Sequence, residues 1–164
     1  MYWGVLALQS CKTKTGETIK IHGLWKKFYD AENNPSCKPC KIGDDPKYCI
    51  EQNYIDQIDK IPHIHEIWLS CLKYNPNMKK ASEKYIQKIK DHNFWEHEYR
   101  KHGACTGFTA VEYFKLAVRL YNEAMEKGES YIKSCQRGKS YLIPVYINNS
   151  SYSIQRGSCR RLKF

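Results

Sequence analysis

Two short segments of the chain concentrate side chains that can transfer protons and bind phosphate. The first, residues 19–25, holds His22 followed by a glycine, which lets the backbone turn or a ligand approach closely. The second segment spans residues 94–105, and its candidate groups are His97, Glu98, Lys101 and His102. An imidazole with a pKa near ~6.5 can act as base or acid in weakly acidic solution. The two segments therefore predict acid–base chemistry.

The spacing of the two histidines in the second segment argues against a catalytic zinc site. The zinc-protease signature places its histidines four residues apart, so that both rings meet one metal from one helix face. Here His97 and His102 are five apart, about 140° around a helix at ~100° per residue. The pairs four apart are His97 with Lys101 and Glu98 with His102. Such a group suits a phosphate that gains and loses charge, with no metal or other cofactor.

RNA is a substrate that matches this set of side chains, because it carries its own nucleophile. Cleavage needs a base for the 2′-hydroxyl proton, an acid for the leaving 5′-oxygen, and positive charge near the phosphoryl oxygens. The bland alternative is a surface histidine on a strand and a solvated charged helix face, which is the commoner situation for each segment alone. Their joint occurrence in one basic, cysteine-rich chain favours the chemical interpretation.

Length and charge set the broad class. The 164 residues suit one globular domain, and no stretch approaches the ~18 apolar residues of a membrane span. Lys and Arg total 27 against 17 Asp and Glu, giving a net charge of +10. This excess favours a polyanionic partner, although charge that serves only solubility gives the same count. Residues 1–9 lack a basic signal-peptide region and are expected to form the first strand of a mature or trimmed protein.

The eight cysteines are even in number and spread along the whole chain. This pattern favours disulfides formed in an oxidising compartment. Cys37 and Cys40 have zinc-ligand spacing, but a second close pair of ligands is missing. Eight cysteines allow about 105 pairings, so their spacing leaves the connectivity open.

The coarse pattern is helical in the middle, with strands at both ends, which indicates an α+β fold. Residues 1–9 and 17–22 are expected as strands, the second with Ile19 and Ile21 on one face. Residues 30–48 are expected to form a loop. Helices are expected from Asn53 to about Pro62 and over residues 78–91. Residues 141–147 contain Pro144 and are expected to form at best an edge or bulged strand.

The best-defined helix is expected to begin at Thr109. Glu112, three residues on, completes a capping box, and Gly128 ends the helix. Its predicted buried stripe consists of Phe114, Ala117, Val118, Tyr121 and Met125.

The two segments resemble a known pair of motifs. Ile21-His22-Gly23-Leu24-Trp25 and Phe94-Trp95-Glu96-His97-Glu98-Tyr99-Arg100-Lys101-His102-Gly103-Ala104-Cys105 look like the active-site segments of the RNase T2 family, the acid ribonucleases that include plant S-RNases. The stretches 5–9 and 112–118 are similar to the family's first strand and to its helix after the second motif. The resemblance covers about residues 3–128. It implies an α+β fold, with an antiparallel sheet flanked by helices, in a single ribonuclease domain over residues 1–164.

The resemblance also implies a reaction and roles. The protein would be a metal-independent endoribonuclease that cuts single-stranded RNA to a 2′,3′-cyclic phosphate and then hydrolyses this to a 3′-phosphate. His22 would be the general base and His102 the general acid, with the reverse assignment open. The residues implied to stabilise the pentacoordinate phosphorane are His97, Glu98 and Lys101. Trp25 would line the phosphate pocket, and Gln9 and Phe94 are candidates for a base subsite.

Disulfides and location follow from the same resemblance. It implies a bridge between Cys49 and Cys105, and a second pair, Cys135 with Cys159, is expected. The cysteines left unassigned are Cys11, Cys37, Cys40 and Cys71. A secreted or lysosomal (vesicular) monomer without a membrane span is expected.

Two other classes of function compete with this interpretation. The first is a basic RNA- or glycan-binding module, an effector or a toxin on a ribonuclease scaffold, in which catalysis is incidental. Such a protein could lose catalytic groups. Here all five implied catalytic residues are present, which favours an enzyme; they are His22, His97, Glu98, Lys101 and His102. The second is a zinc metalloenzyme, which would be sensitive to chelators.

Overall fold

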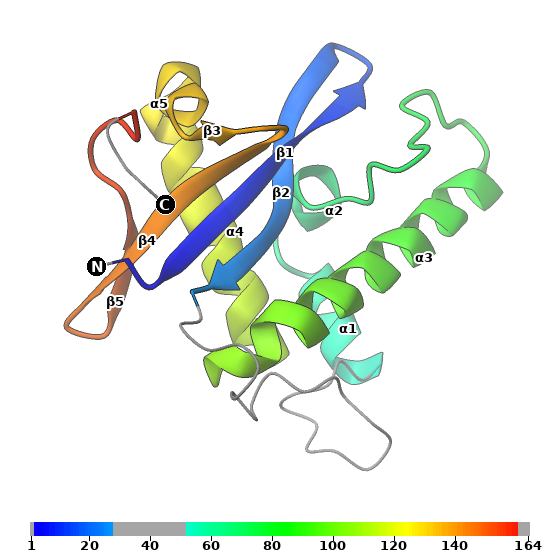
Figure 1. Ribbon diagram of the computed structural model, residues 1–164. Coiled ribbons are helices and arrows are strands. Elements are labelled where there is room, and N and C mark those ends of the chain that lie inside the picture. The colour runs from blue at the N-terminus through cyan, green and yellow to red at the C-terminus, as the bar shows by residue number, and fades with distance from the viewer. Residues whose placement is uncertain (1, 28–51, 161–164) are drawn as a thin grey trace.

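An antiparallel sheet of five strands forms one layer of the protein, shown in Figure 1 as a computed structural model that describes residues 2–27 and 52–160. The strands are β1 (Gly4–Thr13), β2 (Gly16–Lys26), β3 (Gln136–Arg137), β4 (Ser140–Asn148) and β5 (Ser151–Ile154). Their order is β2-β1-β4-β3, and β5 also pairs with β4. Both ends of the described chain therefore contribute to one sheet.

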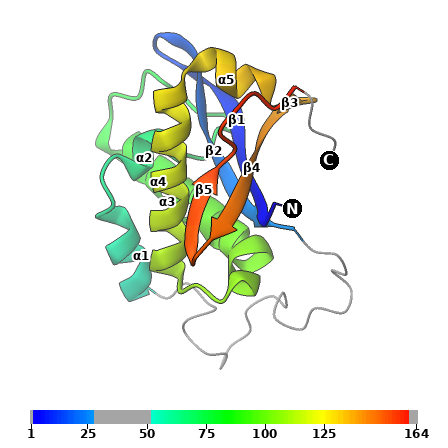
Figure 2. The same ribbon diagram turned by 90° about the vertical axis from the view of Figure 1, so that its left-hand side faces the viewer.

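Helices gather on one face of this sheet, as Figure 2 shows. They are α1 (Gln52–Asp59), α2 (Ile64–Ile67), α3 (Ala81–Glu98), the π-helical turn η4 (Tyr99–Gly103), the 3₁₀ turn η5 (Ala104–Thr106), α4 (Ala110–Lys127) and α5 (Glu129–Ser134). The hydrophobic core lies between the two layers and includes Leu6, Leu8 and Ile21 of the strands. Phe114 and Ala117 of α4 pack against them. The α+β fold expected from the sequence is confirmed.

No helix in the described part of the chain is both long and apolar enough to cross a membrane.

Helix α4 matches its predicted ends but not all of its predicted face. The Thr109–Glu112 capping box is present, and Gly128 follows the last residue. The other four residues of the predicted stripe are buried, but Met125 is 45% exposed, and the stripe continues at Ala124 instead. Ala124 lies seven residues, or two turns, after Ala117 and so keeps the same side of the helix.

The strand that contains Pro144 is an interior strand with a continuous register against β1, so the expectation of an edge or bulged strand at best was wrong. One side of β4 pairs with β1 from Ser140 to Val145. On its other side, β3 pairs with residues 140–141 and β5 with residues 145–148. Pro144 lies between these two partners, at a position where its missing N–H breaks no ladder hydrogen bond on that side.

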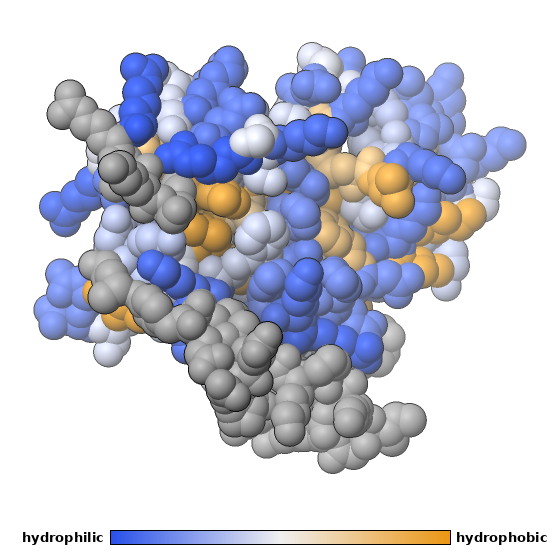
Figure 3. All heavy atoms as spheres, in the orientation of Figure 1, coloured by the Kyte–Doolittle hydropathy of each residue, from blue (hydrophilic) through white to orange (hydrophobic). Residues whose placement is uncertain are grey.

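Helix α3 exposes apolar residues and buries polar ones, and it runs to Glu98 rather than ending near Asp91. Its exposed large hydrophobic residues are Tyr85, Ile86 and Ile89. In Figure 3, hydrophobic groups gather on the surface near the start of this helix, within a mostly hydrophilic face. Gln87 and Asp91 are buried because they bind backbone: the Gln87 amide donates to the Ser70 carbonyl, and Asp91 accepts from the Ser70 N–H, both at 2.9 Å. The hydrophobic spacing therefore located a helix but not its buried face.

The strands expected near the N-terminus are present and longer than expected, while the expected loop at residues 30–48 lies outside the described residues.

Two disulfides cross-link the described part of the chain. Cys135 pairs with Cys159, as expected, and Cys11 of β1 pairs with Cys71, which follows α2. The implied Cys49–Cys105 bridge falls outside what the structure describes, as do Cys37 and Cys40. The two observed bridges fit an oxidising compartment.

Removal of the Cys11–Cys71 bridge is expected to lower the free energy of unfolding by about 4 kcal/mol. The bridge closes a loop with a sequence separation of 60, and a longer loop gives the open unfolded chain more conformational entropy. The measurement is urea denaturation of a Cys11→Ala/Cys71→Ala double variant. The matched Cys135→Ala/Cys159→Ala variant removes a bridge with a sequence separation of 24, so the decrease in its free energy of unfolding should be smaller. An unchanged urea midpoint in the first variant would contradict the prediction.

Candidate active site

His22 is the extra residue of a β-bulge inside β2. In the pairing of β1 with β2, Leu8 lies opposite Ile21 and Ala7 opposite Gly23, so His22 has no partner of its own. A bulge bends the strand and re-aims the inserted side chain. The Trp68 indole N–H donates to the His22 carbonyl at 3.1 Å and so fixes the bulged backbone. The sequence placed His22 at a strand end, whereas it lies within the strand.

The second segment changes helix type in the middle. Helix α3 ends at Glu98, and the next residues form the π-helical turn η4, in which the Ala104 N–H donates to the carbonyl of Tyr99, five residues earlier. A Cβ at Gly103 would clash with the Tyr99 ring, so a glycine is required for this packing. Single π-helical turns are frequent at functional sites. The α-helical angle expected between His97 and His102 therefore does not apply.

Glu98 joins the two segments. It is 2% exposed, and its carboxylate receives contacts from three side chains. His22 Nε2 lies 3.3 Å from Oε1, while the Trp25 indole N–H donates to Oε2 at 2.9 Å. His102 Nε2 lies 3.9 Å from Oε2. Two imidazoles that are 80 positions apart in the sequence thus meet at opposite oxygens of one buried carboxylate.

Aromatic rings surround the two imidazoles. The Trp25 ring stacks on His102, with centroids 5.0 Å apart and planes at 29°, and it meets His22 edge-on at 5.1 Å. The Phe94 ring lies 5.6 Å from that of His22. Trp25 and Phe94, both expected at the site, therefore lie within the cluster and restrict the orientation of the imidazoles.

Positive groups surround His102. Burial lowers the pKa of His102 to about 4, although the Glu98 charge acts in the opposite direction. The charges of Lys101, His22 and His97 contribute to this lowering, so all three lie within electrostatic reach of the ring. The side chains of His97 and Lys101 are exposed, where they can meet an anion from solvent. This concentration of positive charge suits a phosphodiester.

Gln9 lies apart from these residues. It sits on β1 between Lys20 of β2 and Ser140 of β4, and none of the contacts that join the other predicted residues reaches it. The structure thus gathers most of the expected site but leaves this candidate further along the strand.

Two supporting residues, Tyr113 and Trp68, were not found from the sequence, and the need for a glycine at position 23 was found without its partners. The buried Tyr113 hydroxyl donates to the Leu24 carbonyl at 2.7 Å and accepts from its N–H at 3.1 Å, which ties α4 to the strand beside Gly23. Trp68 holds the bulge, as described above. A Cβ at Gly23 would clash with the Glu98 carboxylate and the Trp25 indole nitrogen. A tyrosine or tryptophan with a buried polar tip is a general signal of such a role, but the sequence does not name its partner.

A Gly23→Ala substitution is expected to lower the rate of the RNA cleavage that the sequence predicts about 10- to 100-fold. The added methyl group displaces Glu98 or Trp25, and displacements of about 1 Å near reacting groups have effects of this order. Initial rates on RNA give the measurement, with the urea midpoint recorded alongside. Gly157→Ala is the control, because a Cβ there meets no atom within 4 Å. Equal rates for the two variants would refute the proposed crowding.

Comparisons with known proteins agree with this geometry. The profile of the Ribonuclease T2 family matches residues 4–136. Ribonuclease MC from Momordica charantia is 30% identical over 119 residues, which cover 69% of this chain and 47% of that protein. The chain thus spans about half the length of this curated relative. No solved structure matches the chain with statistical significance. The family profile covers most of the sequence and includes both active-site segments, so this chain belongs to the ribonuclease T2 family.

Proposed function

We propose that this protein is an endoribonuclease that cuts single-stranded RNA, without a metal, by attack of the 2′-hydroxyl on the adjacent phosphate. The observation that carries the proposal is the shared carboxylate of Glu98, which brings His22 and His102 together beside aromatic rings and positive charge. Membership of the ribonuclease T2 family supports it.

The reaction has two steps. In the first, the 2′-oxygen loses its proton to a base and bonds to phosphorus, while the bond to the 5′-oxygen breaks and that oxygen gains a proton from an acid. The product is a 2′,3′-cyclic phosphate. In the second step, water loses a proton to the former acid and bonds to phosphorus, while the bond to the 2′-oxygen breaks and that oxygen gains a proton from the former base, which leaves a 3′-phosphate. The developing charge on the phosphoryl oxygens is stabilised by His97 and Lys101.

The electrostatics favour His102 as the base of the first step and His22 as the acid, the reverse of the assignment given first above. With its pKa lowered to about 4, His102 is neutral in weakly acidic solution and can accept a proton. Glu98 lies beside the Nε2 atoms of both rings and stabilises whichever imidazole is protonated.

Substrate binding is assigned to the aromatic residues and the charge of the site. Trp25 lines the phosphate pocket and Phe94 offers a face on which a base can stack. Gln9 is kept as a more distant candidate for base contacts. The two disulfides and the net charge of +10 suit a secreted or lysosomal monomer that meets RNA outside the reducing cytosol.

Metal independence and reaction class are tested with the purified protein and EDTA. We expect undiminished cleavage of single-stranded RNA, 2′,3′-cyclic phosphate ends among the early products, and intact DNA, because DNA lacks the 2′-hydroxyl. Cleavage of DNA, or loss of RNA cleavage in EDTA while circular dichroism shows that the protein stays folded, would contradict the proposal.

Leaving-group chemistry separates the acid from the base. An aryl ester of uridine 3′-phosphate has a good leaving group that needs little protonation, so His22→Ala should be about 10²–10⁴-fold slower than wild type on a dinucleotide but close to it on the ester. His102→Ala should be slow on both substrates, because the 2′-hydroxyl still needs a base. The opposite pattern would exchange the two roles.

A further inference from the structure

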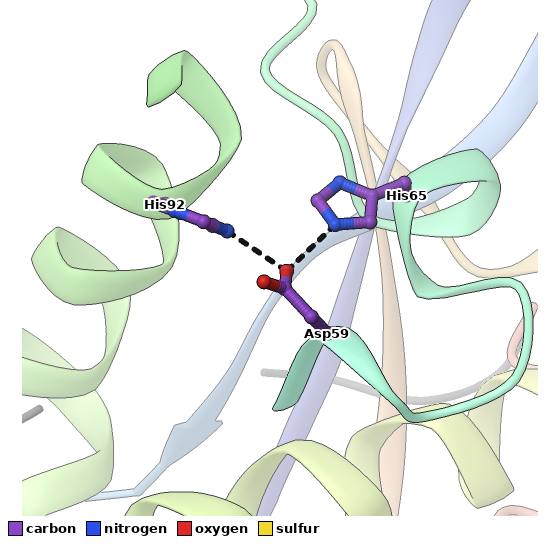
Figure 4. Close-up of side chains that lie close together, drawn as sticks. All are labelled: Asp59, His65 and His92. Atoms are coloured by element: carbon purple, nitrogen blue, oxygen red, sulfur yellow. Dashed lines mark hydrogen bonds and ion pairs between the residues drawn. The ribbon is translucent and has the colours of Figure 1, made fainter. Parts of the chain in front are cut away.

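A second group of polar side chains lies where α1, α2 and α3 meet, away from the catalytic cluster. Figure 4 shows Asp59 of α1 between His65 of α2 and His92 of α3. Asp59 Oδ1 lies 2.7 Å from His65 Nε2 and 2.8 Å from His92 Nε2. Three side chains from three separate elements thus direct potential ligand atoms at one point.

The positions of these atoms suit a small divalent cation. The three ligand atoms all lie within 4.8 Å of one another. Zinc binds imidazole nitrogen and carboxylate oxygen at about 2.0–2.2 Å, which places ligand atoms of a tetrahedral site about 3.3 Å apart. To accept the ion, Asp59 moves about half an ångström away from each ring, and the two imidazole nitrogens, which lie within 4.8 Å of one another, approach to about 3.3 Å.

The buried carboxylate of Asp91 contacts the ring nitrogen of His65 that does not contact Asp59. Asp91 Oδ2 lies 3.0 Å from His65 Nδ1, while its Oδ1 accepts from the Ser70 N–H and the Gln87 amide, both at 2.9 Å. A carboxylate that binds the second ring nitrogen orients a zinc-bound histidine and raises its basicity. With the Nδ1 proton held by Asp91, the contact of 2.7 Å between Nε2 and Asp59 Oδ1 needs either a proton or a metal ion between the two atoms.

Packing holds the imidazole rings of His65 and His92 in place, but both rings remain partly exposed to solvent. The buried ring of Trp95 packs against His65 at 4.8 Å and His92 at 5.3 Å. The side chains of His65, His92 and Asp59 are 34%, 19% and 17% exposed. A cavity of about 370 Å³, lined in part by Asp59 and His65, adjoins them and offers an entry path. Lys88 Nζ lies 3.7 Å from the other oxygen of Asp59, but this side chain is half exposed and can move into solvent.

We propose that Asp59, His65 and His92 form a zinc(II) site that clamps α1, α2 and α3 together, with water as the fourth ligand. Two imidazoles and one carboxylate form a donor set typical of zinc, and an open fourth position is common where the protein supplies three ligands. The site supplies no step of the reaction proposed above. Its effect is structural, because a bound ion links two short helices to the helix that carries Glu98.

Zinc binding is tested by calorimetric titration of EDTA-treated full chain at pH 7.5, followed by thermal unfolding. We expect one zinc per chain, and a Tm rise of about 5 °C or more when free zinc is 100 times its Kd. Cobalt(II) at the same site should show the strong visible absorption of a tetrahedral ion. Asp59→Asn and His92→Ala should each weaken zinc binding at least 10-fold, and circular dichroism checks their fold.

Two control variants make the outcome specific to this cluster. His63→Ala removes a neighbouring histidine whose side chain is 72% exposed and which pairs with Glu66, so zinc binding should be unchanged. A His22→Ala/His102→Ala variant should also bind one zinc, because the catalytic cluster is separate. The proposal is overturned if wild type binds no zinc, if the cluster variants bind it as wild type does, or if the catalytic double variant loses it. None of these results depends on RNA cleavage, so they are independent of the proposed function.

Discussion

Alanine in place of His102 is expected to lower kcat/KM for RNA about 10³-fold or more. The residue is assigned a proton transfer in both steps, and its Nε2 atom lies beside the carboxylate shared with His22. The substitution also removes the group whose pKa is about 4. The kcat/KM of the wild-type protein should therefore rise with pH through about 4, as His102 becomes neutral, and this limb should be absent from the residual activity of the variant.

The measurement is a pH–rate profile of dinucleotide cleavage for both proteins. His63→Ala serves as the matched control, since it removes a surface histidine outside the catalytic cluster and should leave the profile unchanged. Activity near the wild-type level in His102→Ala, with the acidic limb intact, would remove His102 from the mechanism.

Substitution of Glu98 is expected to have the next largest effect, about 10²–10³-fold in kcat for Glu98→Ala. The alanine removes the charge that stabilises a protonated imidazole, and it leaves the buried Trp25 N–H without its acceptor. Glu98→Gln keeps an amide oxygen for that N–H but removes the charge. It therefore separates the positional role of Glu98 from its electrostatic role.

The direction of the pH effect follows from the charged neighbours of His102 in the folded protein. The Glu98 charge raises the pKa of His102, so its loss in Glu98→Gln should move the acidic limb of kcat/KM to lower pH. Profiles of wild type, Glu98→Gln and Glu98→Ala give the measurement. A limb that stays in place in Glu98→Gln would mean that Glu98 acts by position alone.

The candidate catalytic groups could be selected from the sequence because they lie in two short segments. His97, Glu98, Lys101 and His102 are close neighbours in one of them, so the sequence itself places them together. The β-bulge at His22 could not be predicted, because it depends on the register between two strands. The same holds for the π-helical turn after Glu98, which propensities do not distinguish from a continuing α-helix.

The zinc cluster had no sequence signal of its own. Asp59, His65 and His92 come from three elements with no motif spacing, and they meet only in the fold, where Trp95 packs against both imidazole rings. The buried face of helix α3 was predicted wrongly for a related reason. Its apolar spacing suggested a hydrophobic face, but the hydrogen bonds of Gln87 and Asp91 to the Ser70 backbone decided which side is buried.

The bulge in β2 makes the number of residues in this strand matter more than most of their identities. Side chains alternate between the two faces of a sheet, so deletion of one residue between Glu17 and Ile21 would shift every later side chain to the opposite side unless the bulge absorbed the loss. If the bulge absorbed the deletion, β2 would pair regularly with β1 at the position where His22 now has no partner. Natural variation in this stretch should therefore favour replacements over insertions and deletions.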